Sequence, residues 1–274
     1  MNWTELGIRE AVWVSVDVET TGLEVASGHR VCEVAAVRGA IGEAPVELDT
    51  LINPGRAIPT DAVAVSGITD AHVAEAPPFA AVAPRILDVL SGAVIVAHNA
   101  PFDVGFLEVE FGLLGLKLPT APVIDTTVVA QVVFRLPVRN LAAVAHALGT
   151  PHRPRHRAID DARTTRDVLV AGIRKLAGQG VRTVGELVDA LMPPGPFDIP
   201  LTGSPLPALR DALRNGGDVS LTYEGREGLS ERTVRPIRLE TRDRHLVLAA
   251  FCRTRQAPRT FRVDRIVRAS VVGG

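Results

Sequence analysis

Two acidic residues, Asp17 and Glu19, stand two positions apart in a segment that reads V-D-V-E-T-T-G from Val16. The preceding residues from Val12 are mostly apolar and β-branched, which is typical of a buried strand. Because alternate residues of a strand share a face, both carboxylates are expected on one side of it. Two neighbouring anions raise each other's pKa, so a divalent cation is their usual partner. A solvated acidic turn is the alternative, and partner residues further along the chain distinguish the two.

A further acid follows a second apolar run, A-V-I-V-A at residues 93–97, which predicts a short buried strand. The next residues read H-N-A-P-F-D, and Pro101 favours the first position of a helix. Apolar residues at helical spacing from Phe102 to Leu113 support that helix and place Asp103 in its first turn. Either metal binding or the helix dipole would explain an acid at this position.

A third candidate segment begins at His156 and continues to Asp161, five residues later, beside a helix predicted over residues 162–176. His156 is expected on the loop before this helix. A lone histidine in a loop rich in Arg and Pro is usually a surface residue. With a reference pKa of ~6.5, its imidazole also suits the removal of a proton from an attacking water.

Together the three segments resemble the DEDDh, or DnaQ-like, 3′→5′ exonucleases of the ribonuclease H-like superfamily. The resemblance covers about residues 11 to 172. The sister tyrosine type would carry a Tyr where this chain has Arg157, and many members carry a His where it has Ser66. The residues that match the three motifs are Asp17 and Glu19; His98, Asn99 and Asp103; and His156 and Asp161.

The resemblance implies a two-metal hydrolysis of phosphodiester bonds. Two divalent ions ~3.5–4 Å apart can hold the attacking and the leaving oxygen, and hard cations such as Mg²⁺ or Mn²⁺ prefer oxygen ligands. The predicted ligands are Asp17, Glu19, Asp103 and Asp161, with His156 as the general base.

The resemblance also predicts residues beside the terminal nucleotide. These are Thr20, Leu23, His98 and Asn99, although turn packing explains Thr20 and Leu23 equally well. Asp125 resembles a family position too, but we expect it to cap the next helix, predicted over residues 125–134, rather than to bind metal.

The last 70 residues predict a helix over residues 207–215 and then several short strands, which together favour a small β-barrel. They resemble a WYL domain, whose fold is a small Sm-like barrel, from Tyr223 to the segment F-R-V-D-R-I at residues 261–266. The name-giving W-Y-L step reads R-H-L at residues 244–246. The candidates for phosphate contact there are Arg235, Arg253, Arg262 and Arg265, since the Arg fork matches phosphate. Ion pairs, such as one with Asp264, are the alternative.

The predicted fold class is α/β: a ribonuclease H-like mixed sheet flanked by helices, followed by the small barrel. We expect an exonuclease domain at residues 1–176, a linker region with a short helix at 177–204, and a WYL-like domain at 205–274. Of the net charge of −1, residues 1–204 carry −7 and residues 205–274 carry +6. The basic end is a natural partner for nucleic acid, although an arginine-biased composition would also explain it.

The predicted activity is therefore 3′→5′ exonucleolytic hydrolysis of DNA or RNA, with a single strand bearing a free 3′ end as partner. It would serve DNA repair, replication or nucleic-acid turnover. A regulator that senses nucleic acid or a ligand and keeps a vestigial site is the alternative. Cys32 and Cys252 are far apart without a C-x-x-C motif, so zinc is not expected. No run is long and apolar enough for a membrane helix, and a cytoplasmic setting is expected.

Overall fold

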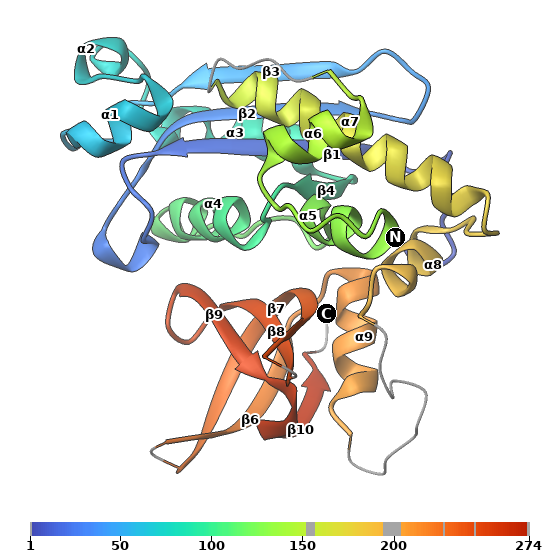
Figure 1. Cartoon of the computed structure of the whole chain (residues 1–274). Helices are drawn as coiled ribbons and strands as arrows, with labels where there is room; N and C mark the ends of the chain where they lie inside the picture. Colours follow the sequence, from blue (N-terminus) through green and yellow to red (C-terminus); the bar gives the residue numbers. More distant parts are fainter. Residues whose placement is uncertain (1, 152–156, 194–203, 227, 244, 273–274) are drawn as a thin grey trace.

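The computed structural model describes residues 2–151, 157–193, 204–226, 228–243 and 245–272. Residues 2–193, here the N-terminal region, form a mixed β-sheet with helices around it, and residues 204–272, the C-terminal region, form a helix and a separate antiparallel sheet (Figure 1). The predicted fold class is confirmed. No helix within the described ranges has the length and apolar character that a bilayer-spanning segment needs.

The N-terminal sheet has the strand order β3-β2-β1-β4-β5, with β1 in its centre. β1 pairs antiparallel with β2 and parallel with β4, so the first three strands form an antiparallel meander and the last two extend the sheet. The bounds of these strands are β1 Trp13–Thr20, β2 Val31–Gly39, β3 Val46–Leu51, β4 Val94–Ala97 and β5 Val123–Asp125.

Helices lie on both faces of this sheet. The helical segments of the described N-terminal region are η1 Val25–Ser27, α1 Thr60–Ser66, α2 Asp70–Val73, α3 Phe79–Leu90, α4 Pro101–Leu113, α5 Thr126–Val128, the π-helical turn η2 Val129–Val133, α6 Leu141–Leu148, α7 Ala158–Ala177 and α8 Val184–Ala190.

Alternation along β2 decides which helix each side chain meets. Ala35 packs against Ala158 of α7, whereas its neighbour Val34 joins the main core, to which α3 contributes from the opposite face. Asp17 of β1 stands directly opposite Ala35 in the antiparallel pair, so its side chain lies on the α7 face. The same alternation places Glu19 on that face, as the sequence predicts.

Two predicted helices begin elsewhere than expected. The helix predicted over residues 162–176 begins at Ala158, which places Asp161 in its first turn. The helix predicted over residues 125–134 divides into α5 and η2, and Asp125 ends β5 instead of belonging to the helix. A strand of three residues is too short to show a periodicity of its own.

The C-terminal region contains α9 Leu206–Asn215 and an antiparallel sheet in the order β10-β6-β7-β8-β9. The rings of Tyr223 on β6 and Phe261 on β9 lie 5.2 Å apart although two strands separate them in the sheet. The sheet is therefore strongly curled. The sequence predicts a small barrel in this part of the chain, and a curled sheet agrees with it. The bounds are β6 Val219–Gly225, β7 Gly228–Arg242, β8 His245–Cys252, β9 Ala257–Arg262, η3 Val263–Arg265 and β10 Ile266–Val271.

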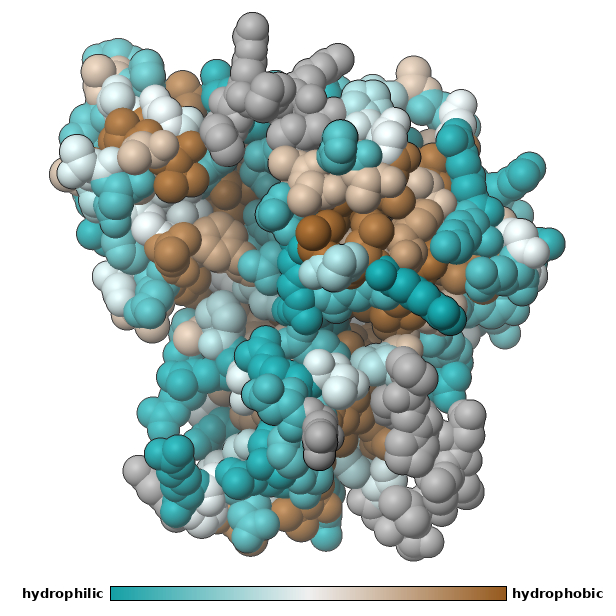
Figure 2. All heavy atoms as spheres, in the orientation of Figure 1, coloured by the Kyte–Doolittle hydropathy of each residue, from teal (hydrophilic) through white to brown (hydrophobic). Residues whose placement is uncertain are grey.

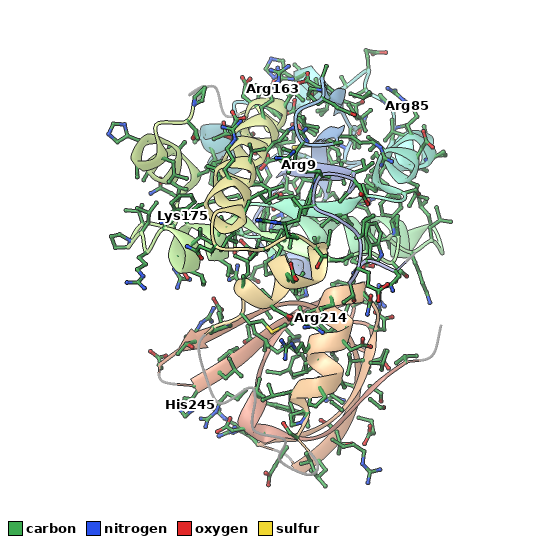
Figure 3. The ribbon with its side chains drawn as sticks, turned by 90° about the vertical axis from the view of Figure 1, so that its right-hand side faces the viewer. Arg9, Arg85, Arg163, Lys175, Arg214 and His245 are labelled. Atoms are coloured by element: carbon green, nitrogen blue, oxygen red, sulfur yellow. The ribbon has the colours of Figure 1, made fainter. Side chains whose placement is uncertain are left out.

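The two regions pack closely against each other. One hydrophobic cluster includes Ile124 of β5 and Leu239 of β7. Gly216, at the end of α9, has a left-handed φ of 77°, and a Cβ there would stand 2.1 Å from the carbonyl carbon of Ala121. Arg214 of α9 pairs with Asp189 of α8 at this junction (Figure 3). The regions therefore share a core.

Polar side chains cover the visible face of the C-terminal strands, whereas the two cysteines lie inside the protein. Hydrophilic residues dominate the visible face over the C-terminal strands, at the lower left of Figure 2. Cys32 on β2 and Cys252 on β8 are free and buried.

Candidate active site

Three carboxylates meet on the α7 face of the sheet. β1 contributes Asp17 and Glu19, and the first turn of α7 contributes Asp161. One oxygen atom of each side chain lies within 4.8 Å of those of the other two, and all three residues are partly exposed. Oxygen ligands at such spacing suit a divalent cation. The structure thus brings together three of the four predicted ligands.

Asp103, the fourth predicted ligand, lies beside them at the edge of β1. It is in the first turn of α4, as predicted, and only 3% of it is exposed. Its Oδ1 accepts a hydrogen bond of 3.1 Å from the backbone N–H of Val18. β4 pairs with β1 only as far as Ser15, so the carboxylate supplies an acceptor beyond the end of the parallel ladder.

The charges of this cluster oppose one another. Burial raises the pKa of Glu19 to about 8, and the charges of Glu33 and Asp161 add to the rise. Burial also raises the pKa of Asp17, followed by the charge of Asp103. Each shift disfavours the ionised form, so the cluster has a physical need for a cation.

Glu33 supports the cluster from the next strand, directly opposite Glu19. It is fully buried, and Arg157 donates to it from Nε at 2.8 Å and from a terminal nitrogen at 2.5 Å. The backbone N–H of Ala158 donates to its other oxygen at 3.0 Å. These bonds fix the start of α7 and hence the place of Asp161. Sequence reasoning missed Glu33, although a lone acid in an apolar strand was a signal.

The loop between β4 and α4 carries the predicted contacts His98 and Asn99. Both ring nitrogens of His98 are engaged, with Thr126 Oγ1 at 2.8 Å and the carbonyl oxygen of Arg139 at 2.6 Å. Burial lowers the pKa of His98. Asn99 has a φ of 67°, which is uncommon for a residue other than glycine. Its backbone N–H donates to Asp125, which also caps α5 through Thr127 N–H, as predicted.

The remaining predicted contacts of the N-terminal region differ in exposure. The hydroxyl of Thr20 donates to the carbonyl oxygen of Gly22 at 2.7 Å, which is the turn role given as its alternative. Leu23 is 81% exposed in the loop that follows β1. His156 lies outside the described residues.

The arginines of the C-terminal region that were predicted to contact phosphate differ in burial and in their partners. The structure corrects the surface role of Arg235, which is 1% exposed and donates to Glu108 of α4 at 2.9 Å. Arg253 is 19% exposed and donates to the other oxygen of the same carboxylate. Arg262 donates to Asp264 at 3.0 and 2.5 Å, the ion pair named as its alternative. Arg265 is exposed. A local pattern reports neither burial against another region nor a distant acidic partner.

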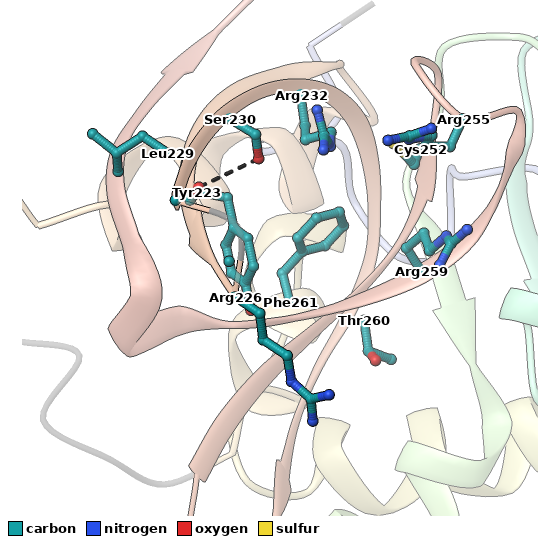
Figure 4. A pocket seen from close by; sticks show the side chains of 12 residues that line it. Tyr223, Arg226, Leu229, Ser230, Arg232, Cys252, Arg255, Arg259, Thr260 and Phe261 are labelled. Atoms are coloured by element: carbon teal, nitrogen blue, oxygen red, sulfur yellow. Dashed lines mark hydrogen bonds between the residues drawn. The ribbon is translucent and has the colours of Figure 1, made fainter.

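A different set of arginines surrounds a cavity of about 450 Å³ at the β6–β7 hairpin (Figure 4). The ring pair of Tyr223 and Phe261 contributes to its wall. No acidic side chain is among its described lining residues. The arginines that line it are Arg226, Arg232, Arg255 and Arg259.

Comparison with known families agrees with this geometry. Residues 14–169, more than half of the chain, match the model of the family described as exonuclease. The chain belongs to this exonuclease family. Residues 205–271 match the model of the WYL domain. Both resemblances drawn from the sequence motifs are confirmed. The matched segments, residues 14–169 and 205–271, are the exonuclease domain and the WYL domain.

Relatives share mainly the exonuclease part. A putative bifunctional exonuclease/endonuclease protein of Mycobacterium tuberculosis (strain CDC 1551 / Oshkosh) is 38% identical over 196 residues, or 68% of this chain. The chain spans only 30% and 27% of the length of the first curated relatives that it matches.

Two solved structures share the fold. Exonuclease X, in complex with 5′ overhanging duplex DNA, is 24% identical over 65% of this chain and 99% of its own, with a TM-score of 0.52. E. coli Exonuclease I, in complex with a dT13 oligonucleotide, is 17% identical over 88% of this chain and 55% of its own, with a TM-score of 0.55.

Proposed function

We propose that this protein is a two-metal-dependent 3′→5′ exonuclease that removes nucleotides from the 3′ end of DNA or RNA in the cytoplasm. The observation that carries the proposal is the meeting of Asp17, Glu19 and Asp161 within 4.8 Å in a chain of the exonuclease family. A role in DNA repair, replication or nucleic-acid turnover would follow from that activity.

The residues present fit divalent cations. The donors are all carboxylates, which Mg²⁺ and Mn²⁺ prefer, and the raised pKa of Glu19 shows that the cluster is unfavourable without positive charge. Asp17, Glu19, Asp103 and Asp161 would hold the ions. When bound, such ions activate water and neutralise charge on the phosphate that is attacked.

The chain's own side chains supply positioning and proton transfer. Asp103 is held against β1 by Val18, and Asp161 is held by the Glu33–Arg157 pair at the start of α7. In the proposed reaction His156, five residues before Asp161, takes the proton of the attacking water. Thr20, Leu23, His98 and Asn99 remain the proposed contacts of the terminal nucleotide.

The WYL domain would grip the strand that leads to this site, and single-stranded nucleic acid is the proposed partner. Support comes from the cavity in which four arginines surround an aromatic pair, since phosphates favour Arg and bases stack on rings. Arg262 and Arg265 are proposed to contribute to the same surface. The E. coli Exonuclease I structure with an oligonucleotide supports this partner by analogy of fold.

The same cavity favours a second candidate function. An anion or nucleic acid sensed by the WYL domain could regulate a chain whose exonuclease site is vestigial. The four carboxylates are all present in their predicted elements, which favours an active enzyme over this alternative.

A degradation assay separates the two candidates. Single-stranded DNA, RNA and duplex DNA are incubated with Mg²⁺ and with the wild type, Asp17→Asn or Asp88→Asn, which alters an exposed acid on α3. We expect Mg²⁺-dependent degradation that Asp17→Asn lowers more than about 100-fold, because one carboxylate ligand is lost. Asp88→Asn should match the wild type. If Asp17→Asn is as active as the wild type, the proposed site is wrong, and an inactive wild type favours the regulator.

A further inference from the structure

We infer that Arg238, a residue of the WYL domain, is a positioning residue for the proposed exonuclease site. It holds Asp125, and through Asp125 it fixes the backbone of Asn99 and Ala100, from which α4 and Asp103 begin. The inference rests on the proposed function, and it makes the WYL domain part of the structure that shapes the active site.

Arg238 reaches the exonuclease domain from a bulge in β7, where the pairing with β8 shifts between Pro236 and Arg238. Bulges of this kind redirect side chains. The side chain is 10% exposed, and one of its terminal nitrogens donates to the carboxylate of Asp125, whereas the other lies 3.3 Å from Glu240 Oε2. The nitrogen that donates to Asp125 also lies 3.3 Å from Thr127 Oγ1 and 3.4 Å from Asn99 Oδ1.

Asp125 connects Arg238 to the backbone of the loop between β4 and α4. Its side chain is fully buried, and it accepts hydrogen bonds from the N–H groups of Asn99 at 3.1 Å and Ala100 at 2.9 Å. Arg238 is the cation that pairs with it in the described part of the chain. Because a buried carboxylate without its cation is strongly unfavourable, loss of Arg238 would favour rearrangement of this loop.

The loop has little freedom to move without consequence for the site. The left-handed backbone of Asn99 persists because its surroundings hold it. Asp103 follows four residues later in the first turn of α4, where its carboxylate meets Val18 of β1. A shift at Asn99 would therefore change the distance between Asp103 and the carboxylates on β1.

Two other arginines of the WYL domain provide matched controls. Arg253 donates to Glu108 in the middle of α4, so it joins the same two domains without touching the loop. Arg242 is 52% exposed and pairs with Glu240 on its own strand, a carboxylate that Arg238 also contacts at 3.3 Å. Loss of Arg253 breaks its pairs with Glu108 and Asp218 away from the loop, whereas loss of Arg242 leaves the Arg238–Asp125 pair in place.

The test measures kcat, KM and the Mg²⁺ concentration that gives half-maximal activity for Arg238→Met, Arg253→Met and Arg242→Met, together with thermal unfolding. We expect Arg238→Met to lower kcat by about 10–100-fold, because small displacements of reacting groups have effects of this size. It should also raise the half-saturating Mg²⁺ concentration, and Arg238→Lys should recover part of both losses. Arg253→Met should unfold at a lower temperature with kcat within about threefold of the wild type, and Arg242→Met should resemble the wild type.

A second variant covers the case in which Arg238→Met folds poorly. Asp125→Asn/Arg238→Met removes both charges. The single Asn oxygen still accepts from Asn99 N–H, and only the bond from Ala100 N–H is lost, so this variant should fold and exceed Arg238→Met in kcat. The inference is overturned if Arg238→Met keeps the wild-type kcat and Mg²⁺ dependence, or if it loses no more kcat than Arg253→Met. If the wild type degrades nothing, the proposed function fails, and Mn²⁺ affinity alone decides the inference: it should be weaker in Arg238→Met.

Discussion

At the scale of single residues, the candidate site depends on side chains of two kinds. Asp17, Glu19 and Asp161 offer oxygens to a cation, whereas Glu33 and Arg157 hold the start of α7 in place. The chemistry of a metal site fixes the type of its ligands and the family resemblance gives their order, so the sequence motifs could reveal them. Supporting residues form contacts between distant segments, and no local pattern reports such a contact.

Replacement of His156 tests whether proton transfer and metal binding belong to different residues, as proposed. His156→Ala removes the proposed base and leaves the four carboxylates intact. We expect turnover to fall by about 10²–10⁴-fold, the usual contribution of a general base, with Mn²⁺ affinity unchanged in a titration. Full activity of His156→Ala would remove this residue from the mechanism, and loss of Mn²⁺ affinity would assign it to the metal site instead.

At the scale of elements, α4 links the site to the WYL domain. Its first turn carries Asp103, and further along it Glu108 is 2% exposed and pairs with Arg235 and Arg253. Apolar spacing and Pro101 predicted the helix and its start correctly. They could not predict its second role, because Glu108 resembles an ordinary surface acid until the WYL domain covers it.

A pair of glycines on α4 tests this close contact. A Cβ on Gly105 would stand 2.5 Å from Cγ of Pro258 on β9, whereas a Cβ on Gly112 would have no neighbour nearer than 3.4 Å. Gly105→Ala should lower the free energy of unfolding by about 1–3 kcal/mol through overpacking. Gly112→Ala should leave it unchanged or raise it by up to about 1 kcal/mol, since Ala favours a helix. Urea unfolding measures both, and equal values for the two variants would contradict the contact.

At the scale of the whole molecule, part of the opposite charge of the two regions is paired across their interface, which the sequence did not show. Residues 1–204 carry a net charge of −7 and residues 205–274 a net charge of +6. Some of these charged side chains form ion pairs with each other at the domain interface. Arg235 and Arg253 pair with Glu108, and Arg238 pairs with Asp125. Net charge by region was computable from the sequence, but the pairing was not, because it depends on how the two domains pack. The arginines around the cavity are the part of that charge proposed for nucleic acid.

The direction of degradation tests the central claim most directly. A single-stranded oligonucleotide labelled at its 5′ end is incubated with the protein and Mg²⁺, beside a copy whose 3′-terminal linkages are phosphorothioates. We expect a ladder of 5′-labelled products that shorten stepwise from the 3′ end, and much slower loss of the protected strand. Immediate release of the labelled 5′ nucleotide, or a strand that stays intact, would contradict a 3′→5′ exonuclease.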